Sequence, residues 1–215
     1  MLTTEVIFNV IDSNAVNVVI GADRYPIQLL VEVIPGDGSA MFRVPSPTGP
    51  LWDVGGGAAR RITIPPAQFM NDKFGAIRIR SVKDAGDPPQ PSTDAFVAYV
   101  ALGSPSITAP VTSQHFMGTD FRIPLLAVTP PSTQVVRLCL TAIETATQVM
   151  IKNLTDGAVL AQIPQIAPRA SYLFTHTQNV DGELQVESLG GGRLVCSAFI
   201  ERRQSFRLYP LAASF

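Results

Sequence analysis

The sequence predicts an all-β protein built from two tandem β-sandwiches, of immunoglobulin-like or jelly-roll-like type. Short runs rich in Val, Ile, Leu, Phe and Thr recur from end to end, and each is bounded by Gly, Pro, Asp or Asn. The 215 residues include 18 prolines and 16 glycines, which interrupt the backbone too often for long helices. The short spacing between runs is typical of sandwiches and jelly rolls and leaves no room for the helices of βαβ units.

Fifteen runs have the composition and length of strands. In the first half they are Glu5–Ile11, Ala15–Ile20, Ile27–Ile34, Ala40–Val44, Arg61–Ile64, Ala76–Val82 and Ala95–Leu102. In the second half they are Phe121–Val128, Gln134–Ile143, Gln148–Lys152, Ala158–Ile163, Ser171–Thr175, Glu183–Ser188, Leu194–Glu201 and Phe206–Tyr209. Tight turns are predicted at Asp37-Gly38, Asp156-Gly157 and Asp181-Gly182, because glycine adopts a positive φ at little cost.

Segments of the first half align with segments of the second half. Gly75–Ser81 falls on Gly182–Ser188 with its apolar and polar positions retained, and Phe96–Ala98 falls on Leu194–Cys196. Leu29, Val31 and Val33 likewise fall on Val136, Leu138 and Leu140. We interpret these matches as two copies of one sandwich, although alternation alone would also align two unrelated all-β stretches.

The repeat predicts the domain boundaries. Residues 1–103 form an N-terminal sandwich with an extra leading strand, Glu5–Ile11, for which the second half shows no counterpart. Residues 104–120 are poor in charge and rich in Ser, Thr and Pro, so we expect an extended linker there. Residues 121–215 form the C-terminal sandwich.

Charge and hydropathy restrict the partners. Sixteen Lys and Arg against 17 Asp and Glu give a net charge of -1, which disfavours binding to a phosphate backbone. No apolar run approaches the ~20 residues of a membrane-spanning helix, and Met1–Val10 lacks the basic region of a signal peptide. Charged residues make up 15% of the chain, against about 25% in a typical soluble domain, so we expect part of the surface to meet other proteins.

The residues that usually carry catalysis are scarce or wrongly spaced. His115 and His176 lie far apart, in no spacing typical of metal ligands, and there is no G-x-S-x-G nucleophile elbow. The glycine run Gly55–Gly57 lacks the G-K-[ST] ending of a phosphate loop. We therefore predict no catalytic residue, metal site or cofactor, and a protein that is not an enzyme.

Cys139 and Cys196 are far enough apart in the chain for an immunoglobulin-like bridge between two sheets, but we favour free thiols. Val136, Leu138 and Leu140 mark the inward face of their strand, so Cys139 lies on the opposite face, and nothing implies an oxidising compartment for a bridge to Cys196.

Three groups of residues are candidates for contact with a partner. A leading strand such as Glu5–Ile11 can close its own sheet or add to a neighbour's edge. Two adjacent arginines follow the glycine run, and arginine suits interfaces, although a paired surface arginine is the commoner case. The third group is an apolar tail. The predicted interface residues are Val6, Phe8, Val10, Arg60, Arg61, Tyr209, Leu211 and Phe215.

In style, the chain resembles the accessory virion proteins of tailed bacteriophages, of the decoration or cement class. The likeness covers most of the chain and lies in tandem sandwiches, few charges, abundant Pro, Thr and Ala, and extended termini. It implies a homo-oligomeric protein, made in the host cytoplasm and located in the virion, that binds capsid or other virion proteins. The alternative is a carbohydrate-binding or adhesive module of a tail tip or fibre, for which one Trp and four Tyr are a low count.

Overall fold

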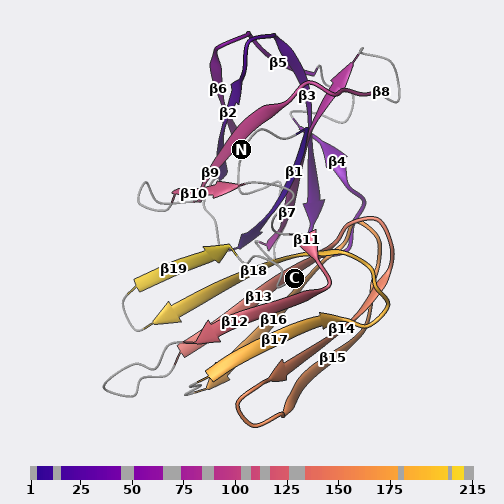
Figure 1. Ribbon diagram of the computed structural model, residues 1–215, viewed down its shortest axis with the longest axis vertical. Helices are drawn as coiled ribbons and strands as arrows, with labels where there is room; N and C mark the ends of the chain where they lie inside the picture. The colour runs from indigo at the N-terminus through magenta and orange to yellow at the C-terminus, as the bar shows by residue number, and fades with distance from the viewer. Residues whose placement is uncertain are drawn as a thin grey trace. The chain divides into compact units, whose positions relative to one another are not determined.

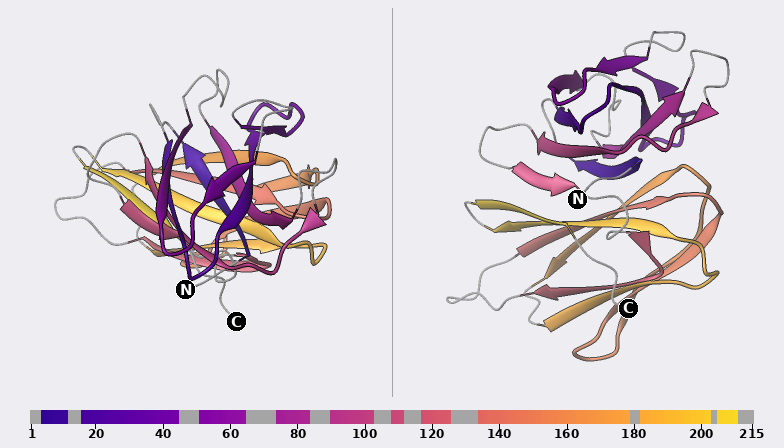
Figure 2. Two further views of the ribbon diagram at one scale, coloured as in Figure 1. Left: turned by 90° about the horizontal axis from the view of Figure 1, so that it is seen from above. Right: turned by 45° about the horizontal axis from the view of Figure 1, so that its top comes forward.

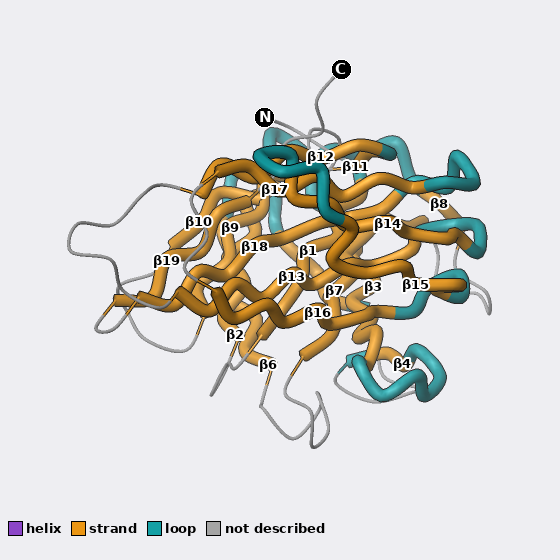
Figure 3. The backbone as a smooth tube through the Cα atoms, turned by 90° about the horizontal axis from the view of Figure 1, so that it is seen from below, coloured by secondary structure: helices purple, strands orange, loops and turns teal. Residues whose placement is uncertain are grey.

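The computed structural model contains strands and no helix among the residues that it describes, which are 4–11, 16–44, 51–64, 74–83, 90–102, 108–111, 117–125, 134–178, 182–202 and 205–210 (Figures 1 and 3). The chain divides into two units, Met1–Gln114 and His115–Phe215, and each is a β-sandwich. The predicted fold class is confirmed. Within the described residues there is no helix long and apolar enough to cross a membrane.

The first unit has two antiparallel sheets. Sheet 1 has the order β1 (Glu5–Ile11), β7 (Phe74–Lys83), β3 (Ile27–Pro35), β4 (Phe42–Arg43), with β5 (Trp52–Val54) paired to β3 and β8 (Gln90–Pro91) paired to β7. Sheet 2 has the order β10 (Thr108–Val111), β9 (Phe96–Leu102), β2 (Val16–Ala22), β6 (Ala59–Ile64). The alternating Val16, Val18 and Ile20 are buried, and they form part of the core between the two sheets.

The second unit repeats this arrangement. Sheet 3 has the order β11 (Met117–Gly118), β18 (Leu194–Arg202), β13 (Gln134–Ala142), β16 (Ser171–Gln178), with β19 (Ser205–Pro210) paired to β18. Sheet 4 has the order β12 (Asp120–Leu125), β17 (Gly182–Ser188), β14 (Thr147–Asn153), β15 (Val159–Ile166). The layers of each unit can be followed in Figure 2.

The ladder registers of the two units match strand by strand. In sheet 1, Ile79 pairs with Val6 and Val31, and in sheet 4, Val186 pairs with Phe121 and Ile151. In sheet 2, Val18 pairs with Ile62 and Val100, and in sheet 3, Leu138 pairs with Phe174 and Ala198. Strands β1, β2, β3, β6, β7, β9 and β10 thus correspond to β12, β13, β14, β16, β17, β18 and β19. This agreement supports two copies of one sandwich.

The registers correct part of the sequence alignment. They keep the match of Gly75–Ser81 with Gly182–Ser188 and that of Phe96–Ala98 with Leu194–Cys196. The match of Leu29, Val31 and Val33 with β13 is wrong by one strand, because β3 corresponds to β14. Apolar alternation is the same on neighbouring strands, and only the partners of a strand tell them apart.

Two boundary predictions also change. The leading strand β1 has a counterpart, β12, and both begin with the same backbone contact: the Ser81 N–H donates to Thr4 O at 2.9 Å, and the Ser188 N–H donates to Thr119 O at 2.7 Å. The expected linker 104–120 contains β10, which pairs with β9, and β11, which pairs with β18. Strand pairing therefore takes up part of the segment that composition alone marks as a linker.

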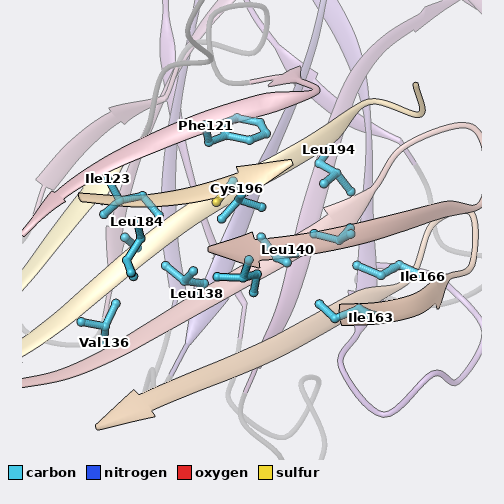
Figure 4. Packing of buried hydrophobic residues seen from close by; sticks show 14 of the residues in the cluster. Phe121, Ile123, Val136, Leu138, Leu140, Ile163, Ile166, Leu184, Leu194 and Cys196 are labelled. Atoms are coloured by element: carbon cyan, nitrogen blue, oxygen red, sulfur yellow. The ribbon is translucent and has the colours of Figure 1, made fainter. Parts of the chain in front are cut away.

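The core of the second unit lies between sheets 3 and 4. Its cluster of buried residues includes Phe121, Leu138, Leu140 and Leu184, and Figure 4 shows Ile123, Leu184 and Cys196 converging from three different strands. Burial of each such aliphatic side chain stabilises the fold by about 1.5–3 kcal/mol. The core thus explains why β12, β17 and β18 come together.

Both cysteines are free, as predicted. Cys139 pairs with Ser197, one residue away from Cys196, so adjacent positions of the ladder place the two side chains on opposite faces of sheet 3. Cys196 is fully buried in the core. Burial, and to a smaller extent the neighbouring Cys139, raises the pKa of the Cys196 thiol well above its usual range, which makes it unreactive.

Candidate functional site: the sheet edges

The residues of the predicted N-terminal arm are part of the core. Val6, Phe8 and Val10 are buried, and the strand that holds them pairs with β7 from Glu5 to Ile11. We therefore correct the prediction that these side chains contact a partner. Of the two possibilities open from the sequence, closing its own sheet is the one that the strand adopts, because its apolar face fills the first sandwich.

The predicted C-terminal tail begins as a strand. Tyr209 lies in β19, where its backbone pairs with Ala198. Leu211 and Phe215 lie outside the described residues. Their proposed contacts stay predictions.

Arg60 and Arg61 lie on β6, which forms one edge of sheet 2. The Arg60 guanidinium carbon lies 4.8 Å from the centroid of the Trp52 ring, and its Nη1 donates to Asp53 O at 2.7 Å. The Trp52 Nε1 donates to Val44 O at 2.8 Å, which fixes the ring. The aromatic ring and the carbonyl together hold the positive charge of Arg60 at the edge.

Arg61 is held on the opposite side of β6. Its Nε and Nη2 donate to Asn17 Oδ1 at 3.0 and 2.8 Å, and Thr63 Oγ1 donates to the same oxygen at 2.9 Å. Both arginines are thus exposed and also bound within their own unit. A charged edge strand resists pairing with another strand, because charge cannot be buried cheaply in a continuous sheet.

Strand β16 occupies the place of β6 in the second unit, and it differs at both arginines. Tyr172 and Leu173 stand where Arg60 and Arg61 stand, since Leu140 pairs with Tyr172 as Ile20 pairs with Arg60. Tyr172 is 40% exposed. Strand β16 pairs with β13 on one side, and no described strand pairs with it on the other.

Charge or proline is present on the other long edge strands of the described residues. Strand β12 holds Arg122 and Pro124, β15 holds Pro164 and two register shifts, β19 holds Arg207 and Pro210, and β1 holds Glu5. These features prevent uncontrolled pairing of edges. Strand β16, with eight residues of sequence SYLFTHTQ, has neither. Its composition was visible in the sequence, but its edge position was not.

Within the described residues, no group of three His, Cys, Asp or Glu is placed to hold a metal ion. His176 stacks on Phe174, with ring centroids 6.0 Å apart and the planes inclined by 12°. His115 lies outside the described residues. We assign the candidate site to the sheet edges, where β6 and β16 differ in charge.

Comparisons of the chain with protein-family models, curated proteins and solved structures give no match.

Proposed function

We propose that this chain is a non-catalytic assembly protein of a virion, of the decoration or cement class, that packs against capsid or other virion proteins. The observation that carries the proposal is the uncharged edge of β16, which pairs with no other strand among the described residues and so offers backbone donors and acceptors to a protein partner. A low charge content also suits a surface that is buried on assembly, because less hydration is lost there.

The tandem organisation supports the same role. Each chain carries two copies of one sandwich, so a weak contact made by each copy would act together with the other through effective concentration. A chain with two sandwiches can contact two neighbouring subunits of a shell.

The carbohydrate-binding alternative requires exposed rings that gather at one place. The exposed rings of Tyr25 and Tyr172 belong to different units, and Arg60 occupies one face of the Trp52 ring. We therefore favour contact with protein over stacking on sugars.

The test is to locate the chain in particles purified from its source, by electron microscopy with an antibody raised against the recombinant protein. We expect regularly spaced label on the shell or tail. Particles from which the chain has been removed should carry no label. Particles that lack the chain, or recombinant chain that binds a glycan array as a monomer, would contradict the proposal.

A further inference from the structure

We propose that the open edge of β16 pairs with β16 of a second copy of this chain, antiparallel and about a twofold axis, so that two copies of sheet 3 form one continuous sheet. The inference rests on the proposed function, since both assign the chain to assembly. It goes further by naming the contact surface and its occupant.

The edge is long enough for a stable ladder. Along its inner side β16 pairs with β13 without interruption, from Gln134 opposite Gln178 to Thr141 opposite Ser171. Eight residues of extended strand span about 26 Å, which is longer than most strands of globular proteins. A regular inner ladder also keeps the outer edge straight, because there is no register shift to turn it away.

The composition of β16 favours its own copy as the occupant. In a twofold antiparallel pair, a strand meets its own sequence in reverse, so any charged residue near the middle meets a like charge. Strand β16 holds no Asp, Glu, Lys or Arg, so it avoids this repulsion in every register. The corresponding strand β6 would bring Arg60 and Arg61 near their own copies.

Side chains beside the edge are only partly covered by the chain itself. Tyr172 and Thr175 are exposed and Leu173 is half-buried. A second strand alongside would cover part of the tyrosine ring and the leucine, so apolar burial would add to the new hydrogen bonds.

The experiment uses the full chain in sedimentation equilibrium, from about 1 µM to about 100 µM, where a contact of moderate affinity is resolved. The variant is Thr175→Glu. Thr175 pairs with Arg137 inside the chain, so a glutamate there is favourable for folding, whereas a dimer brings two such carboxylates together. The matched control is Gln162→Glu, at an exposed position of the edge strand β15.

We expect the unaltered chain and Gln162→Glu to dimerise equally, and Thr175→Glu to weaken dimerisation about tenfold or more. A second variant, Tyr172→Arg, places at this edge the residue that β6 carries at the same position, and it should weaken the dimer as well. A chain that stays monomeric over the whole range, or a dimer that both edge variants leave unchanged, would overturn the proposal.

The fold of each variant is checked by hydrogen exchange of the β13 and β14 amides. The same samples are then bound to purified particles. Monomeric chain that still binds particles refutes self-pairing and leaves the proposed function standing. Dimeric chain that is absent from particles refutes the proposed function and leaves self-pairing standing.

Discussion

Strands β6 and β16 are equivalent edge strands in the two copies of the sandwich. Strand β6 carries two bound arginines, whereas β16 carries no charge. The ladders and turns around them coincide. The β5–β6 turn has an Ala58 N–H donating to Gly55 O at 3.0 Å, and the turn before β16 has an Ala170 N–H donating to Ala167 O at 3.1 Å. The ladders and turns of the two sandwiches are thus alike, while their edge strands differ in the contacts that they make.

The outward faces of sheets 1 and 4 show the same divergence. Glu32 and Arg80 form an ion pair in sheet 1, with Nε and Oε2 3.4 Å apart. Lys152 and Glu187 take their places in sheet 4 with the charges exchanged, and their N–O distance is 3.3 Å. Only 6% of the Glu32 side chain is exposed, against 29% and 37% for the second pair. The two ion pairs thus have similar N–O distances, but the Glu32–Arg80 pair is shielded more completely from water.

The largest effects are expected in the two cores. Ile20→Ala in the first unit and Leu140→Ala in the second each remove a fully buried side chain and leave a cavity, so each should lower the free energy of unfolding of its unit by about 2–5 kcal/mol. Hydrogen exchange of the full chain resolves the units, because each amide reports its own strand. Equal loss of protection in both units from one substitution would contradict two separate cores.

The ion pairs should differ in their contributions. Glu32→Ala removes the carboxylate that pairs with Arg80, while Arg78 keeps Glu5 at 2.7 Å, and we expect a loss of about 3 kcal/mol. Lys152→Ala should cost less than about 1 kcal/mol, because its pair is more exposed. Denaturant unfolding measures both. As a control, Glu32→Lys with Arg80→Glu should recover part of the loss from Glu32→Lys alone. Equal costs for the two pairs would show that burial does not distinguish them.

Two glycines at equivalent positions allow a direct comparison of backbone strain in the two sandwiches. Gly75 and Gly182 have φ values of +158° and +130°, and a Cβ would meet the Ile34 carbonyl oxygen in the first case and the Thr155 side chain in the second. Because a backbone atom yields less than a side chain, Gly75→Ala should lower stability by about 2–3 kcal/mol and Gly182→Ala by about 1–2 kcal/mol. Thermal unfolding of the two variants tests this order, and the reverse order would refute the steric explanation.

The smallest effect is a gain. Arg169 has a φ of +57° at the position where the first unit has Gly57, with a φ of +67°. Arg169→Gly removes the cost of a left-handed conformation for a residue with a Cβ, and we expect about 0.5–1 kcal/mol of added stability in the second unit. Gly57→Ala should destabilise the first unit by a similar amount. A lower melting temperature for Arg169→Gly would show that the arginine side chain stabilises the turn.

Local patterns account for what could be predicted. Alternation placed Cys139 and Cys196 correctly as unbridged, and it located strands such as Ile27–Pro35 to within a residue. Two turns formed as expected: the backbone N–H of Ser39 donates to Asp37 Oδ1 and that of Ala158 donates to Asp156 Oδ1, both at 2.9 Å. Each of these features depends on residues that are near in sequence.

The same patterns predicted neither the short strands nor which strands lie at the edges of the sheets. Strands β5 and β10 were not predicted, because a few residues carry too little periodicity. The position of β16 at the end of its sheet was also missed, since composition does not say which strands are central.

The sequence by itself determined the all-β class, most strands and the recurrence of one pattern in both halves, and it favoured free thiols over a disulfide. Only the tertiary structure decided that β1 belongs to its own core, that β3 corresponds to β14, and that β6 and β16 are edges. The physical reason is that alternation is set by adjacent residues, whereas a strand's partners are set by contacts between residues far apart in the chain, which the local pattern does not contain.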